Sequence, residues 1–297
     1  MSLSPLKIII SARAGAAANG AVHELLKQTF DEHDVDVDIS VARNGAELIK
    51  LAREAADGPY KAVVAGGGDG TVSSIAASVI NSDKALGVLP LGTLNHFAKD
   101  LKIPLDLASA VRTIVAGHTT NIDVGEVNNR IFLNNSSLGL YPIIVREREK
   151  RERLGFKKWP AFVWATIQAF RRYPFLDVRL RLNDKFIDRT TPFVFIGNNQ
   201  YAMDLLNIGL RDRLDGGELS IYITQRASRL KLISLALRAV IGRLREDKDF
   251  LDLRSNEVII ESRHKRLRIA FDGEIDVMQP PLHYRIRTRA LRVVVPE

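Results

Sequence analysis

The chain has 297 residues and no cysteine, so disulfide bonds, cysteine metal ligands and cysteine nucleophiles are all excluded. Its six histidines are scattered and lack the short spacing of histidine metal ligands. No apolar run reaches the roughly 20 residues that a membrane-spanning helix needs. The first apolar segment, Leu6 to Ile10, is too short for a secretory signal. These absences predict a cytoplasmic globular protein.

Positive charge is in excess, with 43 Lys and Arg against 35 Asp and Glu and a net charge of +8. Such an excess suits an anionic membrane or a polyphosphate ligand; nucleic acid is not expected. A large part of it lies in the run 146–158, which aromatic residues follow, and segment 230–244 also combines basic and apolar residues. Both segments predict peripheral membrane contact. Helices that only cover the second domain would explain them equally well.

The most informative stretch is a glycine-rich turn that follows a short apolar run. Val63 to Ala65 predicts a buried strand, residues 66–71 read GGGDGT, and Val72 to Ile80 has the apolar spacing of a helix. Glycines let the backbone approach a phosphate closely, and the first N–H groups of a helix point at it. Asp69 would repel a phosphate unless a cation lies between them, which predicts Mg²⁺ at this turn. An ordinary glycine turn is the competing interpretation.

A second turn of the same kind follows one strand and helix later. Gly87 to Leu89 predicts a buried strand, Pro90 and Gly92 end it, and Thr93 offers a hydroxyl group to a phosphate or a nucleotide. The carboxyl ends of parallel strands meet at one edge of a sheet, where ligands bind in open α/β folds. We therefore expect both turns to face one ligand.

The fold class predicted is α/β, with an N-terminal doubly wound parallel sheet and a C-terminal antiparallel β sandwich. Strands and helices alternate over residues 1–120, which predicts a nucleotide-binding domain. Residues 121–297 read as short strands with helical segments at 143–153, 159–173 and 230–244, and the last strand is free to return to the first domain. The site is expected in the interdomain cleft. The strands expected in the second domain are 121–127, 130–135, 176–182, 185–189, 191–196, 217–224, 257–261, 267–271, 282–288 and 290–295.

Together the two turns resemble those of the diacylglycerol kinase catalytic-domain superfamily, which includes bacterial lipid kinases and sphingosine kinases. Later segments agree with the resemblance: Ile122 to Gly125 followed by Asn134 to Gly139, then Gly197 to Asn199, and Phe271 to Glu274. NAD kinases and phosphofructokinases share the glycine turn, whereas the GTLN turn and the late DGE are more specific to the lipid kinases. The resemblance covers about residues 6–295. It implies an ATP-dependent kinase that phosphorylates the hydroxyl of a lipid such as diacylglycerol.

The resemblance also assigns roles to residues of the two turns. Asp69 is expected to organise Mg²⁺ and Asp123 to support it, although Asp123 is equally well explained as a turn residue at a strand end. Contacts to ATP are expected from Arg13, Gly66, Gly67, Gly68, Gly70, Thr71, Gly92, Thr93 and Asn95.

Two later carboxylate groups complete the expected site. The resemblance makes Asp272 the general base and Glu274 a metal-linked or orienting residue, whereas the residues alone describe a commonplace turn. Asp212 and Asp215 lie in a loop that matches a structural Mg²⁺ loop of some bacterial relatives. Solvated carboxylates in a glycine-rich turn explain that loop equally well.

Two departures from the family pattern leave alternatives open. The loop Ser11 to Gly15 replaces the usual Asn-Pro-x-Ser-Gly, and His96 stands where many relatives have aspartate. An NAD kinase-like or sugar kinase-like enzyme is one alternative, and a nucleotide-binding regulatory protein without catalysis is another. A homodimer also stays open.

Overall fold

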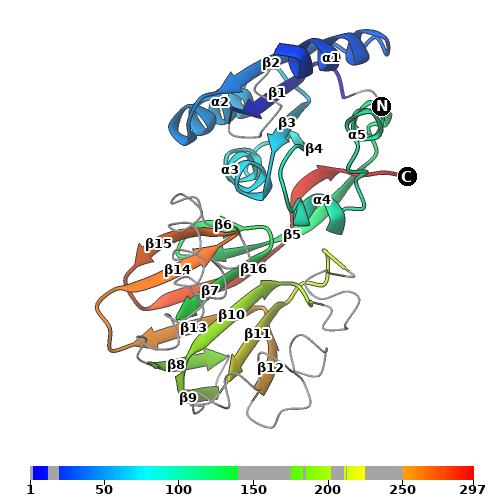
Figure 1. Ribbon diagram of the computed structural model, residues 1–297. Helices are drawn as coiled ribbons and strands as arrows, with labels where there is room; N and C mark the ends of the chain where they lie inside the picture. The colour runs from blue at the N-terminus through cyan, green and yellow to red at the C-terminus, as the bar shows by residue number, and fades with distance from the viewer. Residues whose placement is uncertain are drawn as a thin grey trace. The chain divides into compact units, whose positions relative to one another are not determined.

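The computed structural model describes residues 3–12, 20–139, 175–182, 185–201, 211, 213–224 and 250–297 (Figure 1). The chain divides into two compact units. The first unit comprises Met1–Val124 and Arg287–Glu297, and the second comprises Gly125–Ile286. The helical segments expected at 143–153, 159–173 and 230–244 lie outside the described residues, and so does the basic run 146–158.

The first unit is built on parallel strands in the order β2-β1-β3-β4. β1, β3 and β4 are almost continuously apolar and buried, as expected for strands that helices cover on both faces. The last strand of the chain, β16 (Leu282–Val294), joins this sheet where Val293 pairs with Leu86 of β4. The other strands are β1 (Leu6–Ser11), β2 (Val37–Ala42), β3 (Ala62–Gly67) and β4 (Ala85–Pro90).

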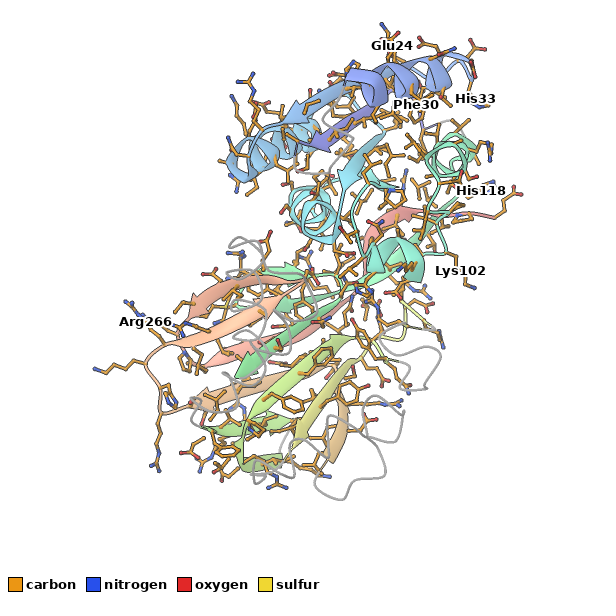
Figure 2. The ribbon with its side chains drawn as sticks, viewed as in Figure 1. Glu24, Phe30, His33, Lys102, His118 and Arg266 are labelled. Atoms are coloured by element: carbon orange, nitrogen blue, oxygen red, sulfur yellow. The ribbon has the colours of Figure 1, made fainter. Side chains whose placement is uncertain are left out.

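Two helices of the first unit begin where a side chain accepts a hydrogen bond from a backbone N–H of the first turn. Asn44 accepts a bond from the Glu47 N–H at 3.0 Å, and Asp106 starts a later helix in the same way. On α1, Phe30 is fully buried while Glu24 points away into solvent (Figure 2). The helices are α1 (Gly20–Asp31), α2 (Gly45–Asp57), α3 (Asp69–Val79), α4 (His96–Asp100) and α5 (Leu107–Ala116).

The second unit consists of two antiparallel layers with an apolar core between them. One layer contains β16, β13, β8 and β9, together with β5 and β6, and the other has the order β12-β11-β10-β7-β14-β15. Along β8, apolar residues are buried and charged residues exposed in strict alternation, which places one face of the strand in the core. The strands are β5 (Thr119–Val127), β6 (Arg130–Phe132), β7 (Asn135–Gly139), β8 (Leu176–Leu182), β9 (Lys185–Thr191), β10 (Phe193–Asn198), β11 (Leu219–Thr224), β12 (Phe250–Ser255), β13 (Glu257–Ser262), β14 (Leu267–Phe271) and β15 (Glu274–Met278).

The predicted fold class is confirmed, with corrections to single elements. The strands expected at 282–288 and 290–295 are one strand, β16, in which Arg289 has a left-handed backbone (φ 50°). That local kink breaks the alternation that the sequence showed. The strand expected at 130–135 is the shorter β6, and β7, β12 and β15 were not predicted. No helix among the described residues is long and apolar enough to cross a bilayer.

Candidate active site

The two glycine turns of the first unit touch each other. A Cβ atom at Gly92 would overlap the Cα atom of Gly68, and one at Gly67 would overlap the side chain of Thr71. The Leu91 N–H donates to the Gly67 carbonyl at 3.2 Å, which joins the ends of β3 and β4. Only glycine permits this approach, so the GGGDGT and GTLN segments form one surface. Gly70 lies in the first turn of α3, beside Thr71.

Asn95 is committed to its own turn. The side chain is 8% exposed, and its Oδ1 accepts from the Gly92 N–H at 3.0 Å. Its Nδ2 donates to the Pro90 and Gly92 carbonyls at 3.1 and 3.0 Å. These bonds hold the turn in shape, with Asn95 in the left-handed region (φ 49°). Thr93 and Leu94 are the exposed side chains of the turn.

Asp69 joins the start of α3 to the start of α4. Its Oδ1 accepts from the Phe97 N–H at 3.0 Å and its Oδ2 from the His96 N–H at 3.2 Å. His96 itself is exposed. Each carboxylate oxygen has two lone pairs. Each oxygen of Asp69 can therefore accept its backbone N–H and still coordinate a cation.

Asp123 is fully buried on β5. Its Oδ1 accepts a hydrogen bond from the N–H of Arg289 at 2.8 Å. Arg289 is the residue of β16 that has a left-handed backbone. This hydrogen bond satisfies the backbone group that the kink removes from strand pairing. The carboxylate therefore has a structural role in the first unit.

Asp272 lies in the second unit, in the turn between β14 and β15. Its Oδ2 accepts from the Leu133 N–H at 2.7 Å, and its Oδ1 from the N–H groups of Asn134 and Asn135 at 2.7 and 3.3 Å. The Asp272 N–H returns a bond to the Asn135 carbonyl at 3.0 Å. Gly273 follows with φ 86°, the backbone region that favours glycine. Asp272 thus binds the whole segment 133–135 through its backbone.

Other polar side chains bind the same segment from its carbonyl side. Asn198, in the predicted Gly197 to Asn199 motif, donates from Nδ2 to the Leu133 carbonyl at 2.8 Å. Arg211 donates to that carbonyl at 2.6 Å and to the Asn134 Oδ1 at 2.8 Å. The sequence did not single out Arg211, because an isolated arginine among charged residues carries no signal of burial. Asn134 and Asn198 belong to segments that agree with the family resemblance, but the sequence assigned neither residue a role.

The remaining predicted residues contribute less to the described site. Glu274 is exposed at the first position of β15. Asp215 is bound by Arg213 at 3.1 Å. Arg13 and Asp212 lie outside the described residues. In the part of the chain that the structure describes, no three His, Asp or Glu side chains are grouped to hold a metal ion.

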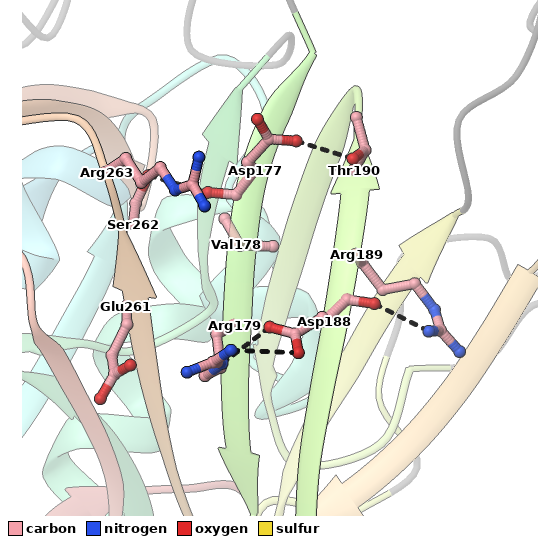
Figure 3. Close-up of a pocket in the computed structure, with 9 residues that line it drawn as sticks. All are labelled: Asp177, Val178, Arg179, Asp188, Arg189, Thr190, Glu261, Ser262 and Arg263. Carbon is pink, nitrogen blue, oxygen red and sulfur yellow. Dashed lines mark hydrogen bonds and ion pairs between the residues drawn. The ribbon is translucent and has the colours of Figure 1, made fainter.

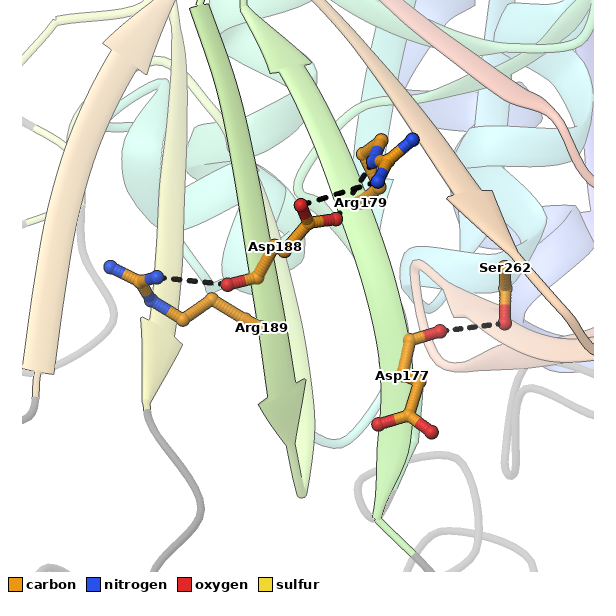
Figure 4. Close-up of polar contacts among 5 residues, drawn as sticks. All are labelled: Asp177, Arg179, Asp188, Arg189 and Ser262. Carbon is orange, nitrogen blue, oxygen red and sulfur yellow. Dashed lines mark hydrogen bonds and ion pairs between the residues drawn. The ribbon is translucent and has the colours of Figure 1, made fainter.

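A hollow of about 650 Å³ lies elsewhere, on β8, β9 and β13 (Figure 3). Three arginines and three carboxylates are among its lining residues, so their charges balance. Arg179 binds Asp188 at 2.7 Å, and the uncharged Thr190 donates to Asp177. Arg189 and Ser262 donate to backbone carbonyls there (Figure 4). The Arg179 guanidinium holds the pKa of the Asp188 carboxyl below its usual range. None of the predicted site residues lines this hollow.

Two family models match the chain. Residues 5–127 match a model described as the diacylglycerol kinase catalytic domain. Residues 142–295 match a model described as the YegS C-terminal NAD kinase β-sandwich-like domain. The first match contains both glycine turns, in agreement with the resemblance predicted from them.

Individual proteins of known sequence or structure are also similar to this chain. A diacylglycerol kinase of Staphylococcus epidermidis (strain ATCC 35984) is 25% identical over 228 residues, which cover 75% of this chain and 71% of the relative. A protein of Klebsiella pneumoniae (strain 342) named "Probable lipid kinase YegS-like" is 33% identical over 154 residues, 51% of each chain. A crystal structure of a diacylglycerol kinase from Bacillus anthracis str. Sterne is 18% identical, with a TM-score of 0.73 over 99% of this chain and 97% of that one. This structural match shows a shared fold.

Proposed function

The chain belongs to the family that joins a diacylglycerol kinase catalytic domain to a YegS-type C-terminal domain, and from this premise we propose that it transfers phosphate from ATP to the hydroxyl of diacylglycerol or a related lipid. Phosphoryl transfer requires bound donor phosphates, neutralisation of their charge, and an oriented acceptor hydroxyl. Residues of the two units are suited to these tasks.

The observation that carries the proposal is the contact between the glycine turns. Gly68 and Gly92 bring two backbone segments together at the carboxyl ends of β3 and β4, where phosphates bind in open α/β sheets. α3 starts at this point and directs its first N–H groups there. Binding of ATP would use Gly66 to Gly68, Gly70, Thr71, Gly92 and Thr93, with Arg13 as a further proposed contact. Asn95 would act by holding its turn.

Mg²⁺ fits the first unit as an ion that arrives with the nucleotide. Such an ion usually binds one or two carboxylates together with substrate phosphates, and it neutralises the charge of the transferred group. Asp69 is the proposed ligand, and Asp123 supports the site by fixing β16. For the loop with Asp212 and Asp215, we propose a weaker metal contact at most, because Arg213 already balances the charge of Asp215.

On the acceptor side, Asp272 is the proposed general base and Glu274 a residue that orients the hydroxyl or binds the metal. Segment 133–135 fixes the Asp272 carboxylate through three N–H donors, so its direction is set before substrate binds. The same donors stabilise its charged form, so Asp272 would be an ionised but weak base whose main contribution is to orient the acceptor hydroxyl.

Incubation of the protein with γ-labelled ATP, Mg²⁺ and diacylglycerol vesicles tests the proposal. Label is expected in a lipid product that partitions into organic solvent. Parallel incubations replace diacylglycerol with NAD or with a sugar. Label in NADP or a sugar phosphate, with none in lipid, would support an NAD kinase-like or sugar kinase-like enzyme instead.

A nucleotide-binding regulatory protein without catalysis is the second candidate. The observation that favours it is the engagement of Asp69 and Asp272 with backbone N–H groups, together with His96 in place of a carboxylate. Nucleotide binding measured by calorimetry, without transfer to lipid, NAD or sugar, would establish this alternative.

A further inference from the structure

The peptide group between Leu133 and Asn134 lies between two opposite charges. Its N–H donates to the Asp272 carboxylate at 2.7 Å, and its carbonyl accepts from the Arg211 guanidinium at 2.6 Å. Arg211 comes from a segment far along the chain from Asp272, and both lie in the second unit. The anion is therefore at the positive end of the peptide dipole and the cation at its negative end.

The peptide group and the arginine are buried, whereas Asp272 at the other end is partly exposed. Leu133 is 1% exposed, Arg211 5% and Asn134 7%. Charged hydrogen bonds are shorter and stronger than neutral ones, and bonds in a chain polarise one another where water is excluded. Each end of this peptide group makes one short hydrogen bond to a charged side chain.

Arg211 is held in this direction by further contacts. Its Nη1 also donates to the Asn198 carbonyl at 3.1 Å, and its Nη2 to the Asn134 Oδ1 at 2.8 Å. The guanidinium lies 5.6 Å from the centre of the Tyr201 ring. A planar group with donors on both nitrogens fits these acceptors together, whereas a lysine ammonium cannot reproduce that fork.

We propose that Arg211 and Asp272 form an ion pair relayed by the Leu133–Asn134 peptide, and that Arg211 is thereby a positioning residue for the acceptor side of the site. The ion pair itself depends only on the geometry of the second unit. The positioning role rests on the proposed function, because it assumes that Asp272 acts on the acceptor hydroxyl. Arg211 touches neither reactant; it acts through the peptide and through Asp272.

A double-mutant cycle in urea tests the relay without any enzymatic activity. Arg211→Met, Asp272→Asn and the double variant are compared with the wild type, and each single change lowers the unfolding midpoint. The unfolding midpoint of the double variant is expected to fall by less than the sum of the two single decreases, because either change alone already removes the relay. Arg254→Met is the matched control: it breaks a surface pair with Glu218, and its loss should add to that of Asp272→Asn. Additive losses for Arg211 and Asp272 would overturn the proposal.

The Asn134 amide proton gives a spectroscopic signature of the relay. In ¹⁵N-labelled protein, Arg211→Met is expected to shift this proton upfield, because the carbonyl on the other side of the peptide loses its cation. Arg254→Met leaves it unmoved. Arg211→Lys keeps the charge with fewer donors and should give an intermediate shift; it also replaces Arg211→Met in the cycle if that variant fails to fold. An Asn134 amide resonance that stays in place in both Arg211→Met and Arg211→Lys would contradict the relay.

Kinetics test the positioning role. Arg211→Met is expected to lower kcat for lipid by about 10- to 100-fold, a cost typical of a misplaced catalytic group, while the KM for ATP stays unchanged. Arg211→Lys should restore a large part of kcat. A wild-type kcat in folded Arg211→Met protein would refute the positioning role. Wild-type protein that transfers nothing to lipid would refute the proposed function instead, and the urea cycle and amide shift would still decide the relay.

Discussion

Three aspartates of the candidate site, Asp69, Asp123 and Asp272, each accept hydrogen bonds from backbone N–H groups distant in sequence. A carboxylate used in this way fixes two chain segments to each other, and it keeps a full charge that a neutral amide side chain lacks. Single substitutions at these positions therefore remove charge and alter local geometry together. A control that loses a comparable hydrogen bond outside the site is needed to separate the two effects.

Asp69→Asn is expected to lower turnover by about 100-fold or more, the scale of losing one preorganised electrostatic contact. The melting temperature should fall only slightly, since asparagine still offers one acceptor oxygen to the His96 or Phe97 N–H. Asp106→Asn is the matched control, because Asp106 also accepts a backbone N–H at a helix start, at 2.9 Å. It should lose similar stability and keep full turnover. Wild-type turnover in Asp69→Asn would exclude Asp69 as the metal ligand.

His96→Asp is expected to lower the Mg²⁺ concentration needed for half-maximal activity. The new carboxylate would stand beside Asp69 and supply a second anionic oxygen group, which Mg²⁺ prefers to a neutral ring. His33→Asp, at another exposed position of the first unit, controls for the added negative charge. An unchanged Mg²⁺ dependence at normal activity would show that position 96 does not face the metal.

Tyr60 predicts a pH dependence of stability. Its hydroxyl donates to Asp38, which raises the pKa of Tyr60 to about 12, while Lys7 and Tyr60 lower the pKa of Asp38. The raised pKa means that the phenol stabilises the fold fully below about pH 10, the unfolded tyrosine value, and stops doing so as the pH rises toward 12. The difference in urea midpoint between wild type and Tyr60→Phe should therefore shrink between about pH 10 and pH 12. A constant difference over that range would contradict this bond.

At the scale of elements, the candidate nucleotide site depends on how closely two turns approach. The contact of Gly68 with Gly92 brings the ends of β3 and β4 together, and Asp69 then joins α3 to the short helix α4. The closest approach is between backbone atoms of the two turns. The distance between the two turns therefore depends on the absence of a Cβ atom at Gly92.

Gly92→Ala is expected to separate the turns, because its Cβ would overlap Gly68 and crowd Asn95. ATP affinity should fall by at least about 10-fold, and stability should fall as well. Gly45→Ala is the matched control at the start of α2, where a Cβ meets nothing within 4 Å. That variant should be as stable as the wild type or slightly more so, by about 0.4–1 kcal/mol. Normal ATP affinity in Gly92→Ala, measured by calorimetry, would place the nucleotide elsewhere.

Elements with strong local signals were predictable from the sequence, and elements fixed by distant contacts were not. The apolar spacing of Val72 to Ile80 indicates α3, and buried strands such as β3 show as apolar runs. β15 is at most partly buried along its length, with Val277 50% exposed, and gave no such signal. The kink at Arg289 is stabilised by Asp123, which a local pattern cannot reveal.

The same limit applies to the site. Glycine spacing identified both turns, because the steric need for glycine is local. The burial of Arg211 against Leu133 and Asn134 arises only when segments from different parts of the second unit pack together. The direction of the Asn95 side chain, into its own turn, also required the structure.

For the whole molecule, the net charge of +8 predicts attraction to anionic surfaces. At low salt, the protein should sediment with vesicles of phosphatidylglycerol and not with vesicles of phosphatidylcholine, and the binding should weaken as salt rises. Equal binding to both vesicles would exclude an electrostatic contact.

Charge reversal can locate that membrane contact. Lys157→Glu combined with Lys158→Glu, in the basic run expected to meet the membrane, should reduce sedimentation severalfold. The matched change, Lys265→Glu with Arg266→Glu, alters an exposed loop between β13 and β14, from which Arg266 projects (Figure 2). It should have a smaller effect. The reverse order would assign the membrane contact to the β13–β14 loop.

The path of β16 also has a consequence for biosynthesis. The first unit takes Arg287–Glu297 as part of its own structure, and Val293 pairs with Leu86. A ribosome therefore releases α1 to α5 long before the strand that borders β4 exists. The β4 edge of the N-terminal sheet therefore stays unpaired while the ribosome synthesises the entire second unit. Pairing over so long a loop is slow, and an unpaired edge favours association with other chains during that interval.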